Sequence, residues 1–589
     1  MNNENIQNQE GEQMESQQPT NTHENIQEPI IDSSREEQII NSTLLDGVLG
    51  YINFDGGSVD NTTSGAMVSA ERRRLFRRDV YVGIRDNEQN VEFLGRIVEG
   101  PFHSPHEIGS DSAITRTTVL HPERTKFRPS YFVYGTIEVL GQLINGERLI
   151  PTPTRPRPYS EIFIFPPDRL KNLLEIDGNI LIGNLMGYEE QKIEVKSDSN
   201  NKNFLPRNVG IFGTVGSGKS NTTQMLIEEA TLAGWAVVVI DVEGEYVRMN
   251  EPNDRLEMNS ILNSNFNLQP IGIADFRTYV PSSGESEAIN PNRFKVPVSQ
   301  LDISVISEIL DLSDAQFRMF EDVVDWINRN PPQQNTQRMG NLTGNTNQIN
   351  NAFPYTLQNL IDTLNNQGFT GRPQINQATV ATLRSKLISF GRSGMLDWNA
   401  NNGIQYLPPQ DFLVGGRLSV LDVSETDDRS RNIAIAYVLQ SLFDLVIETA
   451  EGQNMPGTTT PRPKVLVVIE EVHTFVSRQS VSKMRAVLDN LQTISRRGRK
   501  RWMSLALVSQ QPGHVPDELF ELANTRFIHQ LKSASNLAPV KQSTGGVHEA
   551  LWTNVPALGP GQSLLTGSVF KNPIFVNVRP ARSKRLLTS

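Results

Sequence analysis

One motif, Gly213-Thr-Val-Gly-Ser-Gly-Lys-Ser220, constrains this chain more than any other feature of its sequence. An apolar run at 209–212 precedes the motif, and a helical pattern at 219–233 follows it. Glycines in such a loop let successive backbone N–H groups turn inward around phosphates, while Lys219 can reach the β and γ oxygens and Ser220 can ligate Mg²⁺. The sequence therefore predicts a nucleotide-binding P-loop between a strand and a helix.

A second apolar run, 465–469, ends in two adjacent acids, Glu470 and Glu471. This pattern is typical of a buried parallel strand whose first acid holds the water shell of Mg²⁺ and whose second orients the attacking water. The alternative is a strand that ends in solvated acids. Because two acids stand together downstream of a P-loop, we favour the first interpretation, and the pair indicates hydrolysis rather than nucleotide sensing alone.

Strand and helix patterns alternate around these motifs, with further strands expected at 236–240, 418–423 and 503–509. Such alternation predicts a parallel sheet with helices on both faces. Short strand-like runs before the P-loop predict a small β-barrel, and helical patterns replace strands from about 298 to 397. The predicted fold class is an α/β RecA-like P-loop NTPase core with an N-terminal small β-barrel and a helical insertion.

The predicted domain boundaries follow these changes in pattern. They are a disordered, acidic, Asn/Gln-rich tail at 1–43, a β-barrel at 44–195, the first part of the ATPase core at 196–297, the helical insertion at 298–400, and the second part of the core with a C-terminal brace at 401–589. Within the insertion, 331–351 is rich in Asn and Gln and is predicted to be a mobile loop.

Composition excludes several classes of protein. The chain has no cysteine, which rules out disulfides, thiolate metal sites and Cys nucleophiles. Its first residues carry neither a basic nor an apolar segment, and no apolar run approaches the roughly 20 residues of a membrane helix. We therefore expect a cytoplasmic protein with no membrane partner. The net charge is −11, but residues 1–43 alone contribute nine acids against Arg35, so the average charge does not exclude a nucleic-acid partner.

Five motifs occur in the order expected of one family. LPRNVGIFGTVGSGKSNT (205–222), DVEGEY (241–246), VIEEVH (468–473), RRGRK (496–500) and VSQQP (508–512) make the chain resemble the HerA-like ATPases of the HerA/FtsK group of P-loop motors. The resemblance covers about 44–589, where the β-rich region is similar to the family's HAS barrel. It implies homo-hexameric rings that hydrolyse ATP with Mg²⁺ at subunit interfaces and translocate double-stranded DNA.

The resemblance also implies roles for individual residues. Asp241 and Glu245 match acidic positions near the nucleotide, Arg499 matches an arginine finger that acts on a neighbouring subunit, and Gln510 matches a polar sensor. The predicted nucleotide contacts are Gly213, Thr214, Val215, Gly216, Ser217, Gly218, Lys219, Ser220, Asn221, Asp241 and Glu245. The predicted catalytic residues are Lys219, Glu470, Glu471, Arg499 and Gln510, and the predicted metal ligands are Ser220 and Glu470.

Two positions depart from the family pattern. Glu470 stands where relatives usually carry Asp, and Val242-Glu243 stands where they often carry Pro-His. Neither change removes a type of ligand, although both make a slow motor or a switch more plausible.

Several weaker signals leave alternatives open. Arg496 or Arg497 could be the finger in place of Arg499, and the other basic residues of 496–501 could contact DNA or lie on a solvated surface. His103, His106 and His121 lie in the β-rich region and are interpreted as loop residues rather than metal ligands, and His473 as the start of a helix. The basic C-terminus, which contains Arg579, Arg582, Lys584 and Arg585, could brace a neighbouring subunit, touch DNA or fray.

The sequence therefore predicts an ATP-driven, hexameric, double-stranded-DNA translocase that works with a separate effector docked on the barrel. The effector would be a nuclease in DNA-end processing or an antiphage effector such as a sirtuin-like, NAD-consuming enzyme. A ring scaffold that assembles and gates an effector under ATP control, with little translocation, is the alternative. A conjugation or secretion ATPase is a weaker third hypothesis, because no membrane helix is expected.

Overall fold

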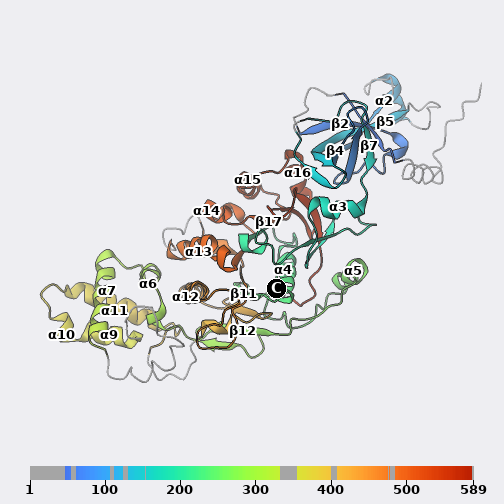
Figure 1. Ribbon diagram of the computed structural model, residues 1–589. Coiled ribbons are helices and arrows are strands. Elements are labelled where there is room, and N and C mark those ends of the chain that lie inside the picture. Colours follow the sequence, from blue (N-terminus) through green and yellow to red (C-terminus); the bar gives the residue numbers. More distant parts are fainter. Residues whose placement is uncertain are drawn as a thin grey trace, which may run out of the picture.

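The computed structural model describes residues 47–54, 62–105, 112–121, 123, 130–152, 154–331, 355–398, 407–474, 476–477 and 485–586. The tail predicted at 1–43, all but the first residue of the loop predicted at 331–351, and His106 lie outside these residues. The described chain is elongated, with a β-barrel at one end, a lobe of helices at the other and a large sheet between them (Figure 1).

The N-terminal barrel is one sheet that closes on itself. Its order is β2-β1-β7-β3-β4-β5, closed by pairing of β2 with β5, and β6 lies outside β5. Its core holds alternate residues of neighbouring strands, such as Val82, Ile84, Phe93 and Ile137, all fully buried. The strands are β1 (Gly50–Ile52), β2 (Thr63–Ser69), β3 (Tyr81–Asp86), β4 (Val91–Pro105), β5 (Tyr131–Ile144), β6 (Arg148–Ile150) and β7 (Glu161–Ile164), with helix α2 (Ala113–Leu120) between β4 and β5.

The large sheet has twelve strands in the order β13-β12-β14-β11-β15-β16-β10-β17-β18-β19-β8-β9. Its strands are parallel from β13 to β17 and antiparallel from β17 to β9. The strands are β8 (Ile180–Leu185), β9 (Glu194–Ser197), β10 (Val209–Phe212), β11 (Ala236–Asp241), β12 (Phe276–Pro281), β13 (Asn292–Phe294), β14 (Leu418–Asp422), β15 (Val465–Ile469), β16 (Met503–Ser509), β17 (Thr525–Ile528), β18 (Gln562–Thr566) and β19 (Ile574–Val578).

One predicted boundary is corrected by this topology. The barrel was expected to extend to residue 195, but β8 and β9 join the large sheet, where β8 pairs with β19 near the C-terminus. The barrel is already closed by the pairing of β2 with β5 without these two strands. A short strand pattern does not specify its partner, and the sequence alone could not assign these two strands to either sheet.

The two faces of the large sheet support separate cores, because successive strand residues point to opposite sides. Val237 and Val239 of β11 pack with α4 (Lys219–Leu232) and with the barrel core, whereas Val238 and Ile240 pack with the opposite face. That opposite face is covered by α12 (Asp428–Glu448), α13 (Arg485–Gly498) and the helical lobe. Elsewhere lie α3 (Pro167–Leu174), α5 (Leu256–Phe266), α14 (Asp517–Phe520), α15 (Ala534–Gln542) and α16 (Glu549–Asn554).

Helix α12 is, among the described residues, the one helix long and apolar enough to cross a bilayer. Of its most apolar window, 61% is buried inside the protein. Residues Ile433 to Leu439 of this helix are almost wholly buried against the sheet. The apolar character of α12 is therefore explained by its place in the core.

The helical lobe is inserted between β13 and β14 and projects from one end of the sheet (Figure 1). Its helices are α6 (Ile303–Ile309), α7 (Asp314–Arg329), α9 (Leu357–Asn365), α10 (Gln367–Thr370) and α11 (Gln377–Gly391). Ser313 and Thr356 begin α7 and α9 with capping boxes, which satisfy backbone N–H groups that a helix start leaves free. The predicted fold class, with its core, barrel and helical insertion, is confirmed.

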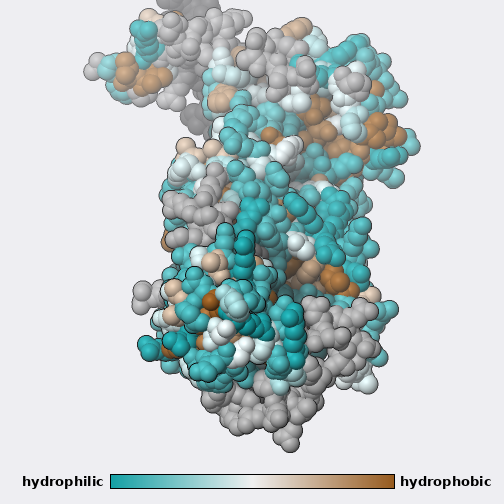
Figure 2. Space-filling view, turned by 90° about the vertical axis from the view of Figure 1, so that its left-hand side faces the viewer, coloured by the Kyte–Doolittle hydropathy of each residue, from teal (hydrophilic) through white to brown (hydrophobic). Residues whose placement is uncertain are grey.

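Seen from the side of the helical lobe, the described surface is mostly hydrophilic, and its apolar residues form small separate patches (Figure 2). Scattered apolar residues are usual on protein surfaces. This face of the molecule therefore shows no large apolar area on the described residues, and the polar edges of the large sheet are the better candidates for a functional site.

Candidate nucleotide site

The predicted P-loop connects β10 to α4 at the carboxyl edge of the parallel strands. Gly216 and Gly218 adopt φ values of 78° and 102°, which favour glycine. A Cβ atom at Gly218 would lie 2.5 Å from the backbone nitrogen of Gly561, so the loop also needs glycine for space. Thr214 anchors the loop through its N–H and hydroxyl, which both donate to the carbonyl of Gln530 at 3.0 Å. The loop geometry is thus set by the neighbouring strands.

Lys219 and Glu471 form a buried ion pair at the base of this loop. Lys219 Nζ lies 2.7 Å from Glu471 Oε1, and both side chains are at most 4% exposed. Glu471 Oε2 accepts the backbone N–H of Gln510 at 3.0 Å and lies 3.2 Å from Nδ1 of His473. Burial opposes ionisation, but the hydrogen bond from His473 and the charge of Lys219 lower the pKa of Glu471 to about 2. Glu471 is therefore an ionised carboxylate held by three partners.

Glu470, the next residue, has a different environment. It is fully buried, and its Oε1 accepts the hydroxyl of Tyr246 at 2.8 Å. Its Oε2 has no hydrogen-bond partner within the described chain. Burial raises the pKa of Glu470 well above its usual range, with smaller effects from nearby charges. The pKa values of these two adjacent acids are thus shifted in opposite directions, because only Glu471 lies within hydrogen-bonding distance of Lys219.

Asp241 holds a backbone turn rather than facing the P-loop. Its Oδ1 accepts the N–H groups of Glu243, Gly244 and Glu245, at 3.3, 2.8 and 3.2 Å, and its Oδ2 accepts that of Tyr246 at 2.8 Å. Burial and the neighbouring Asp422 raise the pKa of Asp241 to about 7. The described hydrogen bonds of the Asp241 carboxylate are all with the loop 243–246, and its contact with a nucleotide stays a prediction.

A Mg²⁺ ion at this P-loop would be held by Ser220 and Glu470. Ser220 lies in the first turn of α4 and is half-buried, and the free Oε2 of Glu470 is an acceptor without a donor among the described residues. Hydroxyl and carboxylate oxygens are the ligands that this ion prefers. The residues present therefore fit the ion.

Arg499 lies at the opposite edge of the sheet. It begins the short helix η8 (Arg499–Arg501) immediately before β16, whereas Gln510 follows the end of β16. The strand spans about 20 Å at roughly 3.3 Å per residue. Arg499 is exposed, as are Arg496 and Arg497 at the end of α13. Arg499 of one chain therefore does not reach the P-loop of the same chain.

Comparison with known proteins shows a similarity to the HerA helicases. The family model "Helicase HerA, central domain" matches residues 180–442. The DNA double-strand break repair helicase HerA of Pyrococcus furiosus is 19% identical over 468 residues, which are 76% of this chain and 77% of the relative. Its counterpart from Saccharolobus solfataricus is 23% identical over 426 residues, 71% of this chain and 72% of the relative.

This chain is thus similar to the HerA helicases. Among solved structures, VirB4 of Thermoanaerobacter pseudethanolicus is similar with a TM-score of 0.43 and 17% identity, covering 69% of this chain and 97% of VirB4.

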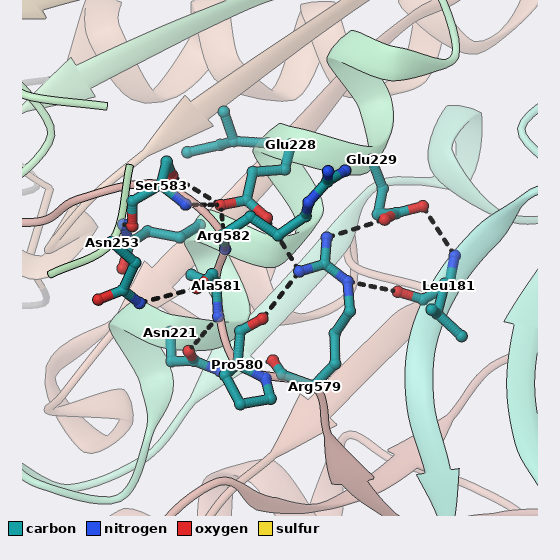
Figure 3. A network of polar contacts seen from close by, with 12 residues as sticks. Leu181, Asn221, Glu228, Glu229, Asn253, Arg579, Pro580, Ala581, Arg582 and Ser583 are labelled. Carbon is teal, nitrogen blue, oxygen red and sulfur yellow. Dashed lines mark hydrogen bonds and ion pairs between the residues drawn. The ribbon is translucent and has the colours of Figure 1, made fainter. Parts of the chain in front are cut away.

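In this HerA-like chain, residues 579–586, which we term the C-terminal strap, lie along their own subunit (Figure 3). Arg579 is fully buried and forms ion pairs with Glu228 at 2.9 Å and Glu229 at 2.8 Å, both on α4. Ser583 donates its N–H and its hydroxyl to Glu228. Fraying, one of the alternatives for the basic C-terminus, is therefore wrong for these residues.

The C-terminal strap also reaches residues predicted to bind nucleotide. Asn221 donates to the carbonyl of Arg579 at 2.9 Å and accepts the N–H of Ala581 at 2.8 Å, and Arg585 pairs with Glu245 at 3.1 Å. The described contacts of the Asn221 side chain are thus with the C-terminal strap, and its contact with a nucleotide stays a prediction. The strap connects the P-loop helix to the acidic loop beside it.

Three residues of the HerA-like site were missed at the level of sequence. His473 contacts Glu471, Tyr246 contacts Glu470, and His529 links the P-loop helix to β17 and β18. His529 Nε2 lies 2.9 Å from the hydroxyl of Thr222, and Nδ1 lies 2.8 Å from the carbonyl of Gln562. Tyr246 and His473 stand within quoted motifs, so their position was a usable signal, whereas nothing near His529 in sequence indicates its partners.

Proposed function

We propose that this chain is an ATP-driven motor that acts on double-stranded DNA as a homo-hexameric ring, in partnership with a separate effector protein. The observation that carries the proposal is the buried pair of Lys219 and Glu471, 2.7 Å apart at the junction of the P-loop and β15. It brings a phosphate-binding cation and a water-orienting carboxylate to one point. The relatives named as DNA double-strand break repair helicases support DNA as the substrate.

The same pair supports a sequence of events during turnover. Incoming phosphates offer Lys219 more negative charge than one carboxylate does, so Lys219 moves to the β and γ oxygens. Glu471 then loses one of its partners while the N–H of Gln510 still holds it. The released carboxylate oxygen can orient the attacking water. Mg²⁺, when bound, supplies charge neutralisation on the phosphates, and Gln510 is placed to sense the γ-phosphate.

The position of the arginines supports action between subunits. Strand β16, which is about 20 Å long, separates Arg499 from the edge of the sheet that carries the P-loop of the same chain. An arginine finger supplied from a neighbour would complete the charge on the γ-phosphate, and a ring provides each site with such a neighbour. The ring of six is carried over from the family resemblance.

The barrel supports the proposed partnership. It forms one end of the described molecule, away from the helical lobe (Figure 1). Two pairs of aromatic side chains, Phe54 with Tyr159 and Phe102 with Tyr134, are exposed on it. We propose this end as the docking site for a nuclease or for a sirtuin-like, NAD-consuming effector.

A second candidate function is an ATP-regulated ring scaffold that gates its effector with little translocation. The observation that favours it is again the ion pair of Lys219 and Glu471. In this pair, each group neutralises the charge of the other, so ATP has to break the pair before Glu471 can act. A site of that kind suits a switch that responds to ATP. The two candidates differ in whether DNA accelerates hydrolysis.

The test is ATP hydrolysis by the purified chain, with and without linear double-stranded DNA, at about 50 and about 200 mM salt. A motor is expected to be stimulated by DNA, and the stimulation is expected to fall steeply with salt because phosphate contacts release counterions. Hydrolysis that DNA leaves unchanged at both salt concentrations would contradict the motor and support the scaffold. Absence of hydrolysis in all conditions would contradict both.

A further inference from the structure

Three glutamates meet beside the P-loop. Glu243 and Glu245 lie on the loop that follows β11, and Glu470 follows β15. Strands β11 and β15 are parallel neighbours, so their carboxyl ends meet at one edge of the sheet. One carboxylate oxygen from each of the three residues lies within 4.8 Å of the others. Around Mg²⁺, whose bonds are about 2.1 Å long, opposite ligand oxygens lie about 4.2 Å apart, so a small inward movement of these side chains would let all three reach one ion.

A buried atom without a partner points to the same place. Glu470 is 0% exposed, its Oε1 is occupied by Tyr246, and its Oε2 has no hydrogen-bond partner among the described residues. Buried carboxylate oxygens are normally satisfied by donors or by metal ions. The cluster therefore contains a deeply buried acceptor that a bound cation would satisfy.

The positively charged side chains near this cluster already form ion pairs. Lys219 is committed to Glu471 at 2.7 Å, and Arg585 of the C-terminal strap is paired with Glu245 Oε2 at 3.1 Å. Three carboxylates thus have, in the described geometry, one ion pair with Arg585 and the more distant charge of Lys219. A divalent cation would balance the remaining charge.

We propose that Glu243, Glu245 and Glu470 together bind a divalent cation such as Mn²⁺ or Mg²⁺ in the absence of nucleotide. Carboxylate oxygens select hard cations of this class. The site depends on Glu243 and needs neither Ser220 nor a phosphate. It shares Glu470 with the metal ligands of the proposed function, but it is tested without ATP, so the two proposals can fail separately.

The experiment is titration of the nucleotide-free, full-length protein with Mn²⁺, with free Mn²⁺ measured by its electron paramagnetic resonance signal. We expect the wild-type chain to remove one equivalent of Mn²⁺ from solution. Glu243→Gln should weaken binding by about tenfold or more, because it removes one anionic ligand. Glu243 is only half-buried, so this variant is expected to fold, which circular dichroism and thermal melting would check.

Two control variants test whether the ion binds at these three glutamates. Glu257→Gln removes an exposed carboxylate on α5 and should bind Mn²⁺ as the wild type does. Lys219→Ala should lose nucleotide binding yet retain Mn²⁺ binding, which separates the ion site from the P-loop. Failure of the wild-type protein to bind Mn²⁺ up to about 1 mM would overturn the proposal. Equal affinity of folded Glu243→Gln and wild-type protein would also overturn it.

Discussion

The two edges of the large sheet differ in charge and in how their side chains are held. The carboxyl edge carries the P-loop and the acids Glu470 and Glu471, whose oxygens contact Lys219, Tyr246 and Gln510 within the same chain. The amino edge carries arginines that are exposed, among them Arg499. Strands of about 20 Å keep the edges apart. The same strands therefore keep Arg499 away from the P-loop of its own chain.

The largest expected effect concerns the carboxyl edge alone. Lys219→Ala should abolish nucleotide turnover, because it removes the ammonium group that contacts Glu471 and is expected to bind the phosphates. The measurement is steady-state ATP hydrolysis, with Lys532→Ala, an exposed lysine, as the control. Turnover at the wild-type rate in Lys219→Ala would show that the P-loop is not the site.

The next effect tests whether the two edges meet between subunits. Arg499→Ala should lower turnover on the order of 10³-fold if Arg499 is the finger. Mixing Arg499→Ala subunits with Glu471→Gln subunits should restore part of the activity, since some interfaces would then pair an intact arginine with an intact glutamate. Arg496→Ala and Arg497→Ala test the two alternative fingers in the same assay. No recovery at any mixing ratio would contradict a role for Arg499 in a neighbouring site.

A smaller effect is expected where the C-terminal strap secures the carboxyl edge. Arg579→Ala leaves Glu228 and Glu229 buried without their shared cation, and breaking such a pair costs about 3–5 kcal/mol of unfolding free energy. The measurement is chemical denaturation. Lys571→Ala is the control, because Lys571 is 40% exposed and lies 4.0 Å from Glu175. Equal stability of Arg579→Ala and wild type would show that the strap does not stabilise α4.

The smallest expected effect is a pH dependence of stability that arises from His529, beside the P-loop helix. Burial lowers the pKa of His529 to about 4, so the native histidine is neutral while the unfolded one takes a proton below about 6.5. The contribution of His529 to stability should therefore be constant above that pH and fall as pH decreases from about 6.5 to about 4, by at most about 3 kcal/mol. Denaturation of wild-type and His529→Gln proteins across this range checks it. An identical acid slope in both would exclude His529 as the cause.

Local sequence was enough to predict the elements of the core. Strand 209–212, the helix from Lys219 and the strands at 465–469 and 503–509 occur where hydrophobic pattern and glycine content placed them. Each of these depends on neighbours within a few residues, so the signal is local. The approximate extent of the helical insertion follows for the same reason, and its helices begin at capping residues visible in the sequence.

The sequence by itself determined that this chain has a P-loop at the end of a strand, two acids at the end of another and a parallel sheet to bring them to one edge. Only the tertiary structure decided that Glu471 pairs with Lys219 while Glu470 keeps an unpartnered oxygen, and that β8 and β9 leave the barrel for the sheet. It also decided that the side chain of Arg579 packs against α4 and pairs with Glu228. These contacts join residues hundreds of positions apart, so they depend on the path of the whole chain rather than on any local pattern.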